Sequence, residues 1–197
     1  MAVSLTPGVD DQVAIMAGIG HVCVQWSLLE NNILAVLCAI ENLAIAEASI
    51  VFGSLDMKPR LNMAVNLAAH HKIDRTLQTR LRNLRTAMDK AKLAERRNRL
   101  VHGVHKASPE PKTFTLYMPR LKGDAQHEDV SVMDAYELGI AIKAAGDEAW
   151  SIFEDYGTWK FGDHRLESHS GEFMAAPPGR FTRFKQYISA SFNRLWG

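Results

Sequence analysis

One apolar stripe in the first quarter of the chain limits the folds that the chain can adopt. Its positions alternate regularly by four and three residues: Ile15, Ile19, Val22, Trp26, Leu29, Ile33, Val36, Ile40 and Leu43. This spacing keeps side chains on one face of an α-helix and would scatter them over both faces of a strand. We therefore expect a helix of roughly 30 residues, ~45 Å long, with other elements covering its apolar face.

The following segments predict further helices of a bundle. A second helix should continue to about Ile50, and a shorter one should follow the break around Pro59 and end near His71. The next is expected as a single helix from Asp74 to about His102, with Gly103 at the position of a C-terminal cap. Its packed face should carry Leu77, Leu81, Leu84, Met88 and Ala91.

The pattern then changes to a period of two, which is typical of strands. Phe114, Leu116 and Met118 alternate with polar residues, and Val130 and Val132 alternate after a gap. This predicts a small β-hairpin inserted near 112–132. A last helix should start in a capping box of Asp134 and Glu137. Its apolar face should carry Leu138, Ile142, Ala145, Ala149, Ile152 and Tyr156.

These patterns predict a mainly all-α protein, an antiparallel bundle of four to five helices with one hairpin. Residues 1–156 should form the helical domain, and the glycine- and proline-containing stretch 157–179 a loose connector. Residues 180–197 should form a basic amphipathic helix. We expect this helix to dock on its own domain or on a second copy, although membrane-surface or nucleic-acid binding is also compatible with its composition.

Composition favours a cytoplasmic protein with no membrane partner. The chain has 197 residues, 47% of them hydrophobic, which is enough for a sizeable core. Its longest apolar run, 33–40, is shorter than the ~20 residues that a bilayer span needs. The first basic residue is Lys58, so no positive n-region of a secretion signal is present.

Cys23 and Cys38 are too far apart on one helix for a disulfide or a shared metal, and are expected to be buried thiols.

The net charge of +1 conceals an asymmetry along the chain. Residues 1–57 contain six acidic residues and no Lys or Arg, whereas residues 72–106 contain eleven Lys or Arg and three acidic residues. Such a basic block is either a solvated helix face or a surface for a phosphate backbone.

Within this block, the segment AERRNRLVHGVH at 94–105 ends the apolar stripe with polar groups. The next positions on the stripe are Glu95, Asn98 and His102. Arg97 follows Leu93 by four and precedes Leu100 by three, so it should also point toward packed surface. A forked cation, an imidazole and an amide suit phosphoryl transfer without a metal or cofactor. HExxH, P-loop and GxGxxG motifs are absent from the sequence, as is a dense carboxylate cluster.

The residues from Arg97 to His102 match the R-[polar]-x-x-x-H signature, with Asn98 as the polar residue. The segment resembles the HEPN superfamily. Many members of that superfamily cleave RNA as toxins, defence effectors or processing enzymes. The literal match covers about a dozen residues, and the helical frame from about 10 to 105 is similar to the family's bundle. The resemblance implies that Arg97 stabilises a phosphorane, His102 acts as general base or acid, and Asn98 positions them. Weaker candidates for substrate binding are Arg96, Arg99, His105 and Glu95, with Glu30 as support.

The resemblance also implies partners. They are RNA, a second copy that completes a composite site across a two-fold axis, and an antitoxin or regulatory protein. Some HEPN toxins have a tyrosine two residues after the histidine, where an antitoxin modifies them. Val104 stands there in this chain, which puts that mode of control in doubt.

A purely structural explanation of the same residues stays open at the level of sequence. His102 beside Gly103 could be a cationic helix cap, worth ~0.3–1 kcal/mol, and Arg97 could pair with Glu95 or Glu30. HEPN-like folds also serve as RNA- or protein-binding modules without catalysis. The alternative to a ribonuclease is therefore such a binding module.

Overall fold

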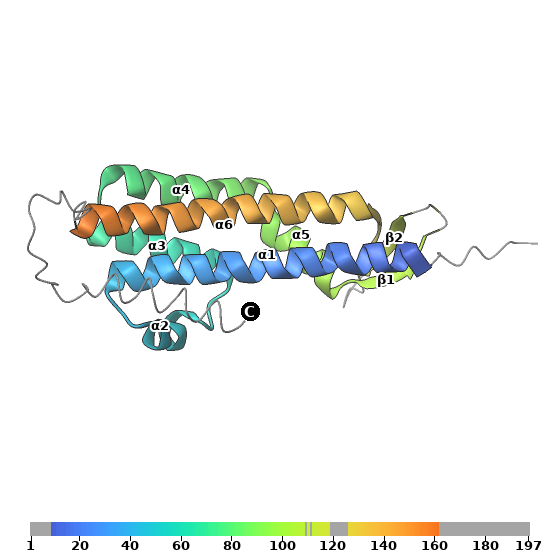
Figure 1. Cartoon of the computed structure of the whole chain (residues 1–197), viewed down its shortest axis with the longest axis horizontal. Helices are drawn as coiled ribbons and strands as arrows, with labels where there is room; N and C mark the ends of the chain where they lie inside the picture. The colour runs from blue at the N-terminus through green and yellow to red at the C-terminus, as the bar shows by residue number, and fades with distance from the viewer. Residues whose placement is uncertain (1–8, 109, 111, 119–125, 162–197) are drawn as a thin grey trace, which may run out of the picture.

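The computed structural model describes residues 9–108, 110, 112–118 and 126–161 (Figure 1). Two long helices, α1 (Val9–Glu41) and α6 (Val132–Phe161), lie side by side along the long axis of the molecule. They run in the same direction. Near the first third of α1, Gly18 packs against Ala135, and further along Asn32 Nδ2 donates to the carbonyl of Gly146 at 2.9 Å.

The remaining helices pack on this pair. They are α2 (Ile45–Phe52), α3 (Met57–His70), α4 (Arg75–Lys90) and α5 (Leu93–His102). Helix α4 runs antiparallel to α3, since Lys58 pairs with Asp89 and Asn62 contacts Arg85. Arg80 joins α4 to α6 through a forked contact with Glu148 at 2.8 and 3.0 Å.

The predicted mainly helical bundle is confirmed, with a higher number of helices and with α1 and α6 parallel. Every position of the first stripe is buried except Ile19 and Leu43, which are half-buried. The helix ends at Glu41, before Leu43, because Asn42 adopts a left-handed conformation with φ 55°. The apolar positions predicted for α6 are all buried.

The single helix predicted from Asp74 to His102 is wrong, because the chain breaks between α4 and α5. Lys92 adopts a left-handed conformation with φ 50° and ψ 38°, and Ala91, expected to be packed, is exposed. The break shifts the packed face of the next helix. Its buried stripe restarts at Leu93 and continues through half-buried Arg97 to Leu100, so Glu95, Asn98 and His102 are exposed.

The predicted hairpin is present as β2 (Thr113–Met118) and β3 (Gln126–Ser131), which pair antiparallel. A further strand, β1 (Val104–Ala107), follows α5 directly and pairs antiparallel with β2, giving the order β1-β2-β3. The sequence did not indicate β1. Phe114 and Leu116 of β2 point into the core, as their alternation predicted.

The start of α6 differs from the prediction because the helix begins two residues earlier. Val132 is its first residue instead of a strand position. The capping box is formed by Ser131 and Asp134. Glu137, the predicted partner of Asp134, does not take part in it. The backbone N–H of Ser131 donates to the Asp134 carboxylate at 2.8 Å, and the N–H of Asp134 donates to the Ser131 hydroxyl at 3.1 Å.

Helix α6 extends beyond the predicted end of the helical domain, and α1 is long and apolar. Helix α6 continues to Phe161, so the connector predicted from 157 begins in a helix. The rest of the connector and the predicted helix 180–197 lie outside the described residues.

By length and composition, α1 could cross a membrane, since a window within Asp10–Glu41 has a mean hydropathy of 1.4. Core helices of soluble proteins have the same character, and the apolar stripe of α1 here lies in the bundle core.

Candidate active site on helix α5

Helix α5 carries all three residues of the motif, and the guanidinium of Arg97 brings them together. Arg97 Nη1 donates to Asn98 Oδ1 at 2.9 Å and lies 3.3 Å from His102 Nε2. A guanidinium N–H can only donate, so His102 Nε2 accepts in this contact and the neutral imidazole has its proton on Nδ1. The cluster therefore holds a permanent cation beside an imidazole nitrogen that can act as a base once this contact opens.

The surroundings of Arg97 are unusual for a half-buried cation. Its Cζ atom lies 5.6 Å from the centre of the Trp26 ring of α1, and its Nε is buried without a hydrogen-bond partner. Across the described part of the chain, no carboxylate forms an ion pair with Arg97. The structure therefore does not show Glu95 or Glu30 neutralising Arg97, and no carboxylate of the described residues compensates its positive charge.

His102 stands at the exposed end of α5. Its side chain is open to solvent, and the helix ends at Gly103, whose N–H donates to Arg99 O at 3.0 Å. Gly103 thus caps the helix as predicted, although in an extended conformation with φ −70° and ψ 152°. An exposed imidazole can exchange a proton with a substrate or with water.

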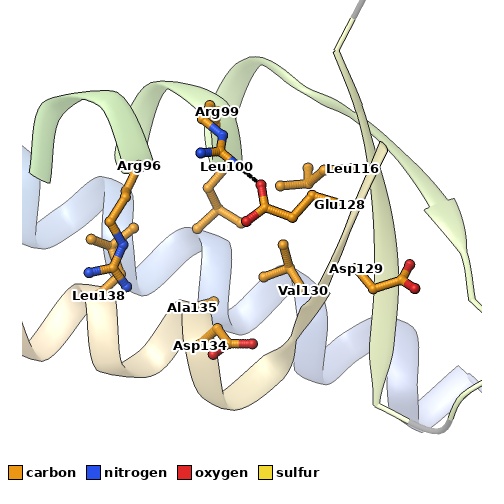
Figure 2. A pocket seen from close by; sticks show the side chains of 10 residues that line it. All are labelled: Arg96, Arg99, Leu100, Leu116, Glu128, Asp129, Val130, Asp134, Ala135 and Leu138. Carbon is orange, nitrogen blue, oxygen red and sulfur yellow. Dashed lines mark ion pairs between the residues drawn. The ribbon is translucent and has the colours of Figure 1, made fainter. Parts of the chain in front are cut away.

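Two other arginines of α5 lie on the opposite flank of the helix and face acidic groups. Arg99 pairs with Glu128 of β3 and more distantly, at 4.0 Å, with Glu95. Arg96 lies close enough to Asp134 for its charge to help lower the pKa of that carboxyl, although the hydrogen bonds from Ser131 contribute more. Both arginines line a cavity between α5, the hairpin and α6, which has a volume of about 240 Å³. Figure 2 shows the side chains around it.

This arrangement separates the predicted substrate-binding arginines from the motif. Arg96 and Arg99 line a partly apolar cavity together with Glu128, Asp129 and Asp134, and Arg99 already pairs with Glu128, so a phosphate would meet negative charge there. The sequence could not indicate this, since the acids come from the hairpin and α6. The structure thus brings together Arg97, Asn98 and His102 and leaves Arg96 and Arg99 apart from them.

The other predicted site residues have local contacts. His105 Nε2 donates to the carbonyl of Leu100 at 2.8 Å, and its ring lies edge-on to Phe114, which ties β1 to α5. Glu95 is exposed. Glu30 accepts a hydrogen bond from Trp26 Nε1 at 2.9 Å, so it is linked to Arg97 through that indole. Trp26 was expected to be only a core residue, and its spacing contains no signal of a contact with Arg97.

The described residues offer no other obvious reactive centre. Burial raises the pKa of the Cys38 thiol to about 11, which leaves it protonated and unreactive near neutrality. In the segments that the structure covers, no group of three His, Cys, Asp or Glu side chains could hold a metal ion. Comparison of the chain with models of protein families, with curated proteins and with solved structures found no match.

Proposed function

We propose that the protein is a metal-independent endoribonuclease of the HEPN type, which cleaves RNA through attack of a 2′-hydroxyl on the adjacent phosphate. One observation supports this most directly: the guanidinium of Arg97, which no carboxylate in the described ranges pairs with, lies 3.3 Å from His102 Nε2. A fixed cation stabilises the negative charge of the phosphorane, and an imidazole can accept or donate the protons that are transferred.

In the proposed reaction, the substrate phosphate draws the guanidinium of Arg97 away from its long contact with His102. The freed imidazole takes the proton of the 2′-hydroxyl, whose oxygen attacks phosphorus while Arg97 stabilises the charge on the phosphorane. The 5′-oxygen then leaves with a proton from an acid. The products are a 2′,3′-cyclic phosphate and a 5′-hydroxyl. Asn98 Oδ1 holds the guanidinium in place between turnovers.

This scheme uses one base and one acid, and each protomer contributes one His102. A homodimer in which two α5 helices face each other would supply both groups. RNA, the proposed substrate, is present in the cytoplasm, where we expect the protein. A toxin or defence effector restrained by an antitoxin or another regulatory protein is the biological role that suits an enzyme of this kind.

The test is cleavage of single-stranded RNA by the purified protein in the presence of a chelator. We expect 2′,3′-cyclic phosphate ends, and no cleavage of DNA of the same sequence, because DNA lacks the 2′-hydroxyl. His102→Ala should lower the rate by about 10²–10⁴, and Arg97→Ala by about 10²–10³. Two exposed residues outside the cluster provide matched controls, Arg82→Ala for the lost charge and His70→Ala for the lost imidazole.

Cleavage that is unchanged in His102→Ala, or that depends on a divalent metal, would contradict the proposal. A binding module would give a different pattern. Arg97→Ala would then weaken RNA or partner binding at a fixed salt concentration, with no cleavage by the wild-type protein or by any variant.

A further inference from the structure

We propose that Trp26 is a positioning residue that keeps the charge of Arg97 available to the substrate by holding the Glu30 carboxylate in a hydrogen bond. This inference rests on the proposed function, because it concerns the same cluster. Trp26 lies beneath the guanidinium of Arg97, and its indole N–H donates to the Glu30 carboxylate at 2.9 Å. One side chain therefore contacts both a cation and an acid.

The location of Arg97 explains why it needs such support. It occupies the buried stripe of α5 between Leu93 and Leu100, which are each 3% exposed. A charge at such a position is usually paired with a carboxylate, because desolvation is costly. An ion pair would hold Arg97 but would also compete with a phosphate. The face of an aromatic ring attracts a cation without neutralising its charge.

Glu30 is the acid that contacts Trp26, and the hydrogen bond from the indole N–H restrains the position of its carboxylate. Trp26 is 5% exposed, so its ring is fixed by the core. The bond from Nε1 occupies Oε1 of Glu30 one helical turn along α1, since the two residues are four positions apart. Without that N–H, the carboxylate would lose its partner and become free to pair with Arg97.

The experiment compares wild-type protein with Trp26→Phe, Glu30→Gln and the double variant. Trp26→Phe keeps an aromatic face but removes the N–H, and should lower kcat about ten-fold with a smaller change in KM. Glu30→Gln can still accept from Trp26 and should stay within about two-fold of wild type. The double variant, which has no carboxylate to release, should recover to within about three-fold of wild type.

A second measurement separates this inference from the proposed catalysis. The affinity of the same four proteins for a 2′-O-methyl RNA oligonucleotide, which cannot be cleaved by a 2′-hydroxyl, should fall in Trp26→Phe and recover in the double variant. If the wild-type protein binds this probe but does not cleave RNA, the proposed function fails while the affinity series still decides the role of Trp26. Absence of binding by the wild-type protein would overturn the inference.

Loss of packing is the competing explanation, because phenylalanine is smaller than tryptophan. A variant with β-(3-benzothienyl)alanine at position 26 keeps the bicyclic shape and lacks only the N–H. It should behave like Trp26→Phe, and adding Glu30→Gln should rescue it. Wild-type behaviour of the benzothienyl variant, or single and double variants that are equally impaired, would show that Trp26 acts only through the core.

Discussion

Arg97 and Arg99 stand two positions apart on α5 and have opposite electrostatic surroundings. Arg99 pairs with Glu128, whereas Arg97 lies on the Trp26 ring with no carboxylate partner among the described residues. Both are basic residues of one motif segment, so composition alone treats them alike. Their partners decide which of them can attract a phosphate, and this favours Arg97.

Asp134 makes a pH-dependent contribution to stability. Hydrogen bonds from Ser131, and to a smaller extent the charge of Arg96, hold the pKa of this carboxyl below its usual value. A depressed pKa means that the carboxylate stabilises the fold above the unfolded-state pKa of about 3.9, and that this contribution is lost as the pH falls through the lower folded-state pKa. Asp134→Asn keeps an oxygen acceptor for Ser131 but removes the negative charge near the helix N-terminus, and should therefore lower the free energy of unfolding by about 0.3–1 kcal/mol at pH 7.

The measurement is urea unfolding at neutral pH and at about pH 3, where the difference between the two proteins should shrink. Glu137→Gln is the control, because Glu137 is exposed on the same helix turn and is not part of the capping box. An equal effect of the two substitutions at neutral pH would contradict the assignment of Asp134 as the capping residue.

At the level of elements, the break at Lys92 decides which residues of α5 face the bundle. A left-handed backbone is unfavourable for a residue with a Cβ atom and is readily adopted by glycine. Lys92→Gly should therefore raise the free energy of unfolding by about 1 kcal/mol. Lys90→Gly, in the last turn of α4, should lower it by about 0.5–1 kcal/mol. Urea unfolding of both variants tests this pair, and a loss of stability in Lys92→Gly would contradict it.

The helices were predictable because their apolar periodicity is local. The break at Ala91 and Lys92 was not, because neither residue is a helix breaker and nothing in the local sequence indicates the left-handed conformation of Lys92. Strand β1 has only four residues and is defined by its pairing with β2. Similarly, Arg97, Asn98 and His102 were recognisable within a few positions. The contact of Trp26 with Arg97, and the acids that separate Arg96 and Arg99 from the site, depend on the fold.

At the level of the whole molecule, the proposed composite site makes activity dependent on association. Each protomer contributes one His102, so specific activity per protomer should fall when the protein is diluted below the dissociation constant of the dimer. Sedimentation at the same concentrations and salt should show the dimer disappearing in parallel. A monomer with constant specific activity throughout the dilution series would contradict the two-protomer scheme.

The parallel pairing of α1 and α6 also affects how the chain is made. Asn32 and Gly146, which contact each other across these helices, are 114 positions apart. At ribosomal rates of about 5–20 residues per second, roughly 6–23 s separate the synthesis of the two. During that interval α1 lacks its longest neighbour, and α5 lacks the helix against which it packs. In the proposed ribonuclease, α5 with Arg97 and His102 would therefore lack its neighbour α6 while the ribosome is still reading the message.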